Sequence, residues 1–130
     1  MTSRGDEITL TLPRGRSFAA VAHLVLGGLA ARHELTLESL DDLRLALDGL
    51  LERPNGEQDV TLALRIGDEA VHASIGPFDG ARLRAELEEE PDESLGLRRL
   101  LETVVDRFEL AERDGGYWVD LTKSVERAAR

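Results

Sequence analysis

The segment of residues 60–75 constrains the fold most, because apolar and polar residues alternate in it twice, on either side of a short turn. The runs VTLALRI and AVHASI each carry one apolar face, made of Val60, Leu62, Leu64, Ile66, Val71, Ala73 and Ile75. The letters GDE between them are typical of a hairpin connection. Hairpin strands with a single apolar face belong to an antiparallel or mixed sheet, and such a sheet needs another layer to cover that face.

Three segments with helical spacing of apolar residues are expected to supply this layer. They cover residues 18–32, 37–53 and 97–106. Pro54 closes the second of them. Further strands are expected at residues 7–12, 108–113 and 117–123, the last two being joined by the turn DGG. We therefore predict an α+β fold, a two-layer sandwich in which a mixed or antiparallel sheet is covered on one face by three helices.

The length of 130 residues fits one domain, and we expect residues 1–130 to fold as a single unit. Residues 77–94 mix glycine, proline and an acidic run, which favours a lid-like connection on the surface that is more mobile than the strands. Its apolar anchors would be Leu83 and Leu87. Residues 124–130 are expected to form a short polar tail.

The charge of the chain excludes several classes of partner. Twenty-six acidic and sixteen basic residues give a formal charge of −10, which repels nucleic acid and anionic lipid. There is no cysteine, and His23, His33 and His72 are scattered, so we expect no metal site. The start lacks a signal-peptide pattern and no apolar run approaches the ~20 residues that span a bilayer. We therefore expect a cytoplasmic protein that binds neither nucleic acid nor membrane.

Two stretches, DDLRLALD and the LGL before the third helical segment, are the most specific parts of a wider resemblance. From about Ile8 to Lys123 the sequence resembles the anti-sigma-factor serine kinases of bacterial partner-switching systems, which belong to the GHKL superfamily of histidine-kinase-like ATPases. The resemblance implies magnesium-ATP held between a helix and a lid. It also implies binding of a sigma factor and phosphorylation of a serine on an antagonist protein.

The first motif of this family is absent. The family has a glutamate base and, four residues later, a magnesium-binding asparagine on the helix that corresponds to residues 37–53. Here these positions hold Gly49 and Arg53, and a guanidinium opposes binding of a divalent cation. A glycine inside a helix costs about 1 kcal/mol relative to alanine. Gly49 therefore marks either close packing of helices or a glycine that is tolerated where a catalytic group lost its use.

The other two motifs are incomplete. In SIGPFDG the resemblance places Ser74 where the family has its adenine-binding aspartate, and Gly76 is the first glycine of DxGxG. The second glycine is replaced by Phe78 or lost through a one-residue deletion. In SLGL, Ser94 replaces the first glycine of the phosphate-binding GxGL motif, while Gly96 and Leu97 are kept. Gly76, Gly96 and Leu97 are then vestigial nucleotide-binding positions, or residues retained for steric reasons alone.

The sequence thus predicts a regulatory protein-binding module without nucleotide chemistry, catalytic residues or a cofactor. By resemblance its partner would be a sigma factor or an anti-sigma antagonist, and a homodimer is compatible with the pattern. One alternative is an ATP-dependent serine/threonine protein kinase that acts as an anti-sigma factor with magnesium-ATP. Another is a subunit that only completes the architecture of a larger complex.

Overall fold

The computed structural model of the chain describes residues 6–13, 16–51, 59–78, 84–85, 87, 96–113 and 115–124. They form an α+β fold with one antiparallel five-stranded sheet in the order β1-β2-β3-β5-β4. The strands are β1 (Asp6–Leu12), β2 (Val60–Ile66), β3 (Ala70–Phe78), β4 (Arg107–Arg113) and β5 (Gly116–Ser124). The helices are α1 (Arg16–Arg32), α2 (Leu37–Leu51) and α4 (Leu97–Val104).

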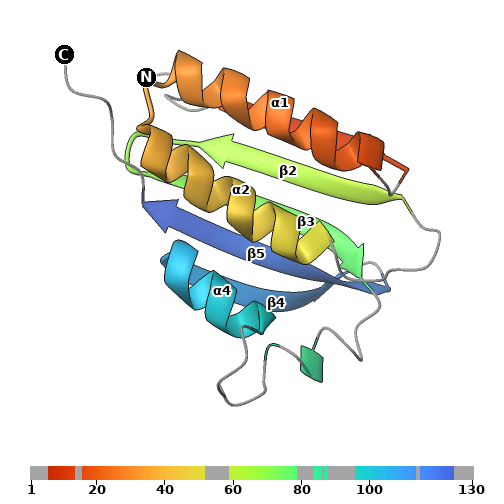
Figure 1. Ribbon diagram of the computed structural model, residues 1–130. Helices are drawn as coiled ribbons and strands as arrows, with labels where there is room; N and C mark the ends of the chain where they lie inside the picture. Colours follow the sequence, from red (N-terminus) through yellow and green to blue (C-terminus); the bar gives the residue numbers. More distant parts are fainter. Residues whose placement is uncertain are drawn as a thin grey trace, which may run out of the picture.

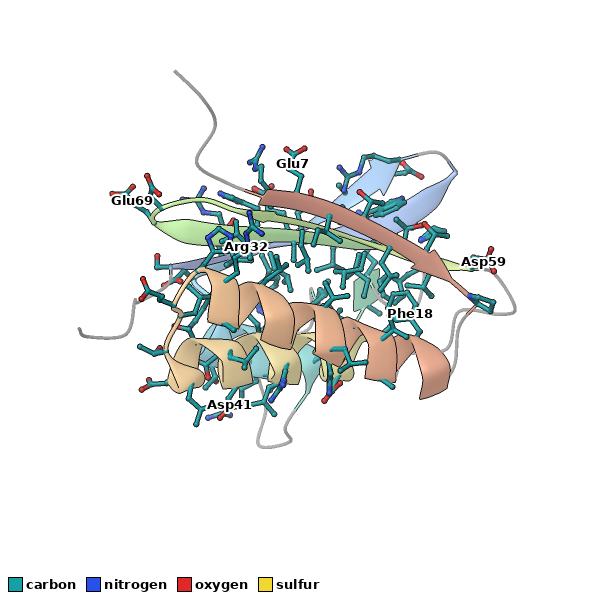
Figure 2. The ribbon with its side chains drawn as sticks, turned by 90° about the horizontal axis from the view of Figure 1, so that it is seen from above. Glu7, Phe18, Arg32, Asp41, Asp59 and Glu69 are labelled. Atoms are coloured by element: carbon teal, nitrogen blue, oxygen red, sulfur yellow. The ribbon has the colours of Figure 1, made fainter. Side chains whose placement is uncertain are left out.

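All three helices lie on one face of the sheet, which leaves its other face uncovered by any described element (Figures 1 and 2). This confirms the predicted two-layer architecture, and the sheet is antiparallel throughout its described strands. Both predicted hairpins are present, as β2–β3 and β4–β5. None of the described helices is long and apolar enough to cross a membrane.

The strand register separates an inner from an outer set of side chains. Leu64 pairs with Ala73 and Ala73 with Leu121, and this row faces the helices. The neighbouring row, in which Ala63 pairs with Ser74 and Ser74 with Asp120, points to the uncovered face. The alternation expected from the sequence therefore runs across three adjacent strands.

The core lies between the helices and the inner face of the sheet. Its largest fully buried side chains are Phe18, Leu43, Leu47, Leu50, Leu62, Ile66, Ile75, Leu97, Leu101, Leu121, Val60 and Val71. Within the predicted lid, Arg84, Ala85 and Leu87 are helical, and Leu87 is buried in this core. Leu87 is therefore an anchor, as expected; Leu83, most of the lid and residues 125–130 lie outside the described residues.

The start of α2 is fixed by a side-chain cap. The backbone N–H of Ser39 donates to Oγ1 of Thr36 at 3.2 Å, which satisfies one of the amides that a helix start leaves without a partner. Leu35 and Leu40, on either side of the cap, both pack into the core. The other end of this segment, including Arg53 and Pro54, lies outside the described residues.

Candidate functional site

Gly49 lies where α2 packs against α4. It is buried, and a Cβ at this position would lie 2.5 Å from Cδ2 of Leu100 and 3.5 Å from Cδ1 of Leu97. Real Cβ atoms are not found as close as the first of these distances, so any larger residue would have to displace the Leu100 side chain. Of the two interpretations of Gly49, the geometry favours close packing of helices.

Leu97 and Gly96, the retained residues of the third motif, have different surroundings. Leu97 is 1% exposed and packs in the seam next to Gly49. Gly96 is exposed at the start of α4, and no atom lies within 4 Å of where its Cβ would be. Its carbonyl accepts the N–H of Leu100 at 3.0 Å. Ser94, which precedes them in the motif, lies outside the described residues.

Gly76 has a steric reason to be glycine. A Cβ there would lie 2.7 Å from Cδ2 of Trp118 and 2.9 Å from the carbonyl oxygen of Tyr117. One of these contacts is with backbone, which cannot rotate away. The indole ring therefore covers the strand at this point, and the glycine is needed whether or not a nucleotide binds.

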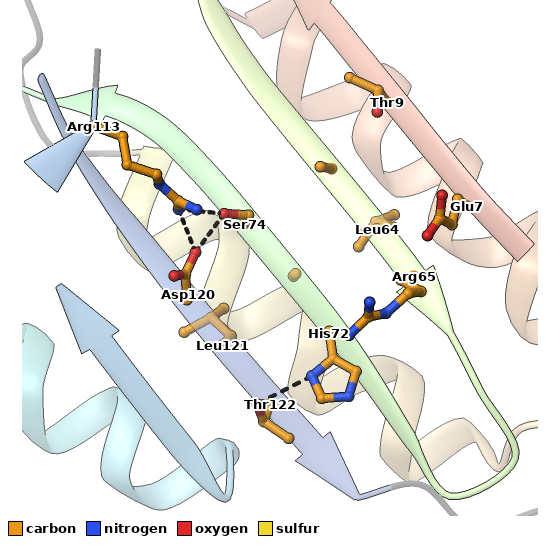
Figure 3. Close-up of a pocket in the computed structure, with 12 residues that line it drawn as sticks. Glu7, Thr9, Leu64, Arg65, His72, Ser74, Arg113, Asp120, Leu121 and Thr122 are labelled. Atoms are coloured by element: carbon orange, nitrogen blue, oxygen red, sulfur yellow. Dashed lines mark hydrogen bonds and ion pairs between the residues drawn. The ribbon is translucent and has the colours of Figure 1, made fainter. Parts of the chain in front are cut away.

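Ser74 belongs to a polar cluster on the uncovered face of the sheet (Figure 3). Its hydroxyl donates to Oδ1 of Asp120. Nη2 of Arg113 donates to the same Asp120 oxygen at 2.6 Å and to Ser74 Oγ at 2.8 Å. The Arg113 guanidinium also lies 5.3 Å from the centroid of the Trp118 ring, within range of a cation–π contact. Ser74 is thus held by β4 and β5.

A shallow groove of about 450 Å³ runs over this face. Its polar lining comes from all five strands and consists of Glu7, Thr9, Arg65, His72, Ser74, Arg113, Asp120 and Thr122. His72 is exposed, and its Nδ1 lies 3.3 Å from Oγ1 of Thr122. Polar residues at alternate strand positions are the sequence signal for this face, but they do not by themselves predict a groove.

Among the family's site positions that the structure describes, Ser74 lies apart from Gly49 and Leu97. Gly49 and Leu97 meet on the helix side of the sheet, whereas Ser74 points away from the helices, and Arg53 lies outside the described residues. The described residues therefore do not fit magnesium-ATP: position 49 has no carboxylate and is covered by Leu100, and Ser74 is on the other face. Within the described ranges, no three histidine or acidic side chains gather where they could hold a metal ion.

A solved structure with a similar fold contains the RsbU and RsbW domains of Rv1364c from Mycobacterium tuberculosis. The two share 19% sequence identity with a TM-score of 0.69, over 96% of this chain and 34% of that chain. This chain therefore spans about a third of that one. No protein-family model matches the sequence, and no curated protein matches it. The likeness shows a shared fold, which confirms the fold expected from the resemblance.

Proposed function

We propose that this protein is a regulatory protein-binding module of the anti-sigma type, which acts without binding or hydrolysing ATP. The observation that carries the proposal is the seam between α2 and α4 at Gly49, a position that has no carboxylate and where even a Cβ would lie 2.5 Å from Cδ2 of Leu100. The fold is intact around this seam, with a continuous core. A preserved fold without the groups that perform the chemistry favours binding as the retained function.

Two separate comparisons, one of sequence and one of structure, favour the same class of partner. The sequence resembles anti-sigma-factor kinases, and the matching structure contains RsbU and RsbW domains. We therefore infer that the partner is a sigma factor or a small antagonist of one. The formal charge of −10 suits a partner with a basic surface.

The test is co-purification of the tagged full chain from cells of its source, followed by identification of the bound protein. We expect a sigma factor or an antagonist. With the purified pair, the dissociation constant should be the same with and without magnesium-ATP, because the module has no nucleotide-dependent state.

Three outcomes would contradict the proposal. Transfer of phosphate from ATP to a serine of the bound protein would establish the kinase alternative. A stable complex whose loss leaves transcription unchanged would favour the architectural alternative. Recovery of no specific protein from the native cells would remove the basis for a binding function.

A further inference from the structure

The outward side of the helix layer carries three exposed leucines. Leu24 on α1 is 75% exposed, and Leu37 and Leu45 on α2 are 70% and 49% exposed. Among the described residues these are the large apolar side chains that are exposed, and we call them the leucine patch. Single exposed leucines are common on protein surfaces, but a group on one face indicates a binding surface.

The three leucines lie on a surface formed by α1 and α2 together. Leu37 and Leu45 are separated by eight residues, which places them about 12 Å apart along the axis of α2 and about 80° apart around it, both on its exposed side. The two helices are joined by His23 Nε2 and Asp48 Oδ1, which lie 2.7 Å apart. Leu24 directly follows His23 on α1 and lies about 100° further around the helix, where it is exposed.

The α1 side of this surface has small uncharged residues around Leu24. Ala20, Gly28 and Ala31 are exposed with Leu24, and no atom lies within 4 Å of where a Cβ of Gly28 would be. The α2 side is acidic, because Glu38 and Asp41 are exposed beside Leu37 and Leu45. Arg44 lies near this edge, with its Nη1 3.9 Å from Oδ1 of Asp41, which is longer than a tight ion pair.

We propose that the leucine patch binds an amphipathic helix of a partner protein, with apolar residues toward the leucines and lysine or arginine toward Glu38 and Asp41. This inference rests on the proposed function and names the surface that performs it. Helices recognise such faces through residues spaced by three and four positions, and charges at the rim set their orientation.

Charge argues against two other occupants. A second copy related by a two-fold axis would present the same acidic surface from both sides of the interface, in a chain that already carries a formal charge of −10. An anionic lipid surface would be repelled by the same carboxylates. A basic amphipathic helix could pack its apolar side chains on the leucines and pair its lysines or arginines with the acidic edge.

The probes are two synthetic peptides of about 15 residues, the length at which isolated helices begin to form. Both have the same leucine stripe, and one has lysines and the other glutamates beside it. Each is titrated into isotope-labelled protein while the backbone amide chemical shifts are followed. We expect the lysine peptide to shift amides of α1 and α2 and the glutamate peptide to bind far more weakly.

Matched variants separate the local surface from overall charge. Leu24→Ser with Leu45→Ser, and Glu38→Lys with Asp41→Lys, should each weaken binding of the lysine peptide by about tenfold or more. The control is Glu7→Lys with Glu109→Lys, which makes the same charge change at exposed positions of β1 and β4. It should change the affinity by no more than about twofold.

The proposal is overturned if the lysine peptide shifts amides of the sheet and not of α1 and α2, or if the Glu7/Glu109 reversal weakens binding as much as the Glu38/Asp41 reversal. It is also overturned if the leucines mediate dimer formation or vesicle binding and the peptide does not bind. The co-purified partner distinguishes this failure from failure of the proposed function. If it binds wild type and the Leu24→Ser/Leu45→Ser variant equally, the surface is wrong and the function stands. If wild type binds no partner, the function is wrong.

Discussion

At the scale of single residues, the glycines of the degenerate motifs differ in what surrounds them. Gly49 is covered by the leucines of α4 and Gly76 by an indole ring and a carbonyl oxygen, whereas Gly96 faces open space. The first two therefore have steric roles in this fold that do not require a nucleotide. The retention of Gly76 therefore says little about ATP, and replacement of either Gly49 or Gly76 should affect stability.

Gly49→Ala should show coupling to Leu100. Alanine gains about 1 kcal/mol over glycine inside a helix, but here the new methyl group must displace Leu100. We expect the gain to be cancelled in the wild type and to appear in full, at about 1 kcal/mol, when Leu100→Ala is also present. The free energies of unfolding in urea of wild type, the two single variants and the double variant measure this coupling. An equal effect of Gly49→Ala in both backgrounds would show that the two side chains do not compete for space.

Gly76→Ala and Gly96→Ala form a second matched pair. The first places a methyl group against Trp118 and the Tyr117 carbonyl and should destabilise the protein by about 1–3 kcal/mol. The second meets no atom and should change the free energy of unfolding by less than about 0.5 kcal/mol. Thermal and urea unfolding give both values. Equal losses at the two positions would contradict the steric account of Gly76.

At the scale of elements, the helices and strands followed from local patterns, whereas their contacts did not. The alternation in residues 60–75 predicted β2 and β3, and the apolar spacing predicted α1, α2 and α4, because each pattern is local. The contact between Gly49 and Leu100 and the cluster of Ser74, Asp120 and Arg113 join distant parts of the chain. They depend on strand order and helix position, which periodicity does not specify.

The Thr36 cap provides a prediction at this scale. Thr36→Ala removes the oxygen that accepts the Ser39 N–H and should cost about 1 kcal/mol of stability, whereas Thr36→Ser keeps a hydroxyl and should cost less. Amide hydrogen exchange in the first turn of α2, together with urea unfolding, measures the difference. If the alanine and serine variants are equally stable, the cap does not contribute and the core alone fixes the start of α2.

At the scale of the whole molecule, the helix layer and the uncovered sheet face provide two surfaces of different character. The helix side has the filled seam at Gly49 and the leucine patch, while the sheet side has a polar groove with mixed charge. The sequence predicted the two-layer fold. The alternation of Val71, Ala73 and Ile75 already places Ser74 on the opposite face of the strand, whereas the resemblance assigned Ser74 to a nucleotide site on the helix side.

The central claim, that this fold works without a nucleotide, is tested most directly by isothermal titration calorimetry of the purified full chain with ATP and magnesium. The missing carboxylate and the leucines in the seam predict no saturable heat at nucleotide concentrations up to about 1 mM, where even weak binding of about −4 kcal/mol would begin to register. Saturable binding in the micromolar range would contradict the account, because the chain would then need a nucleotide site that does not depend on position 49.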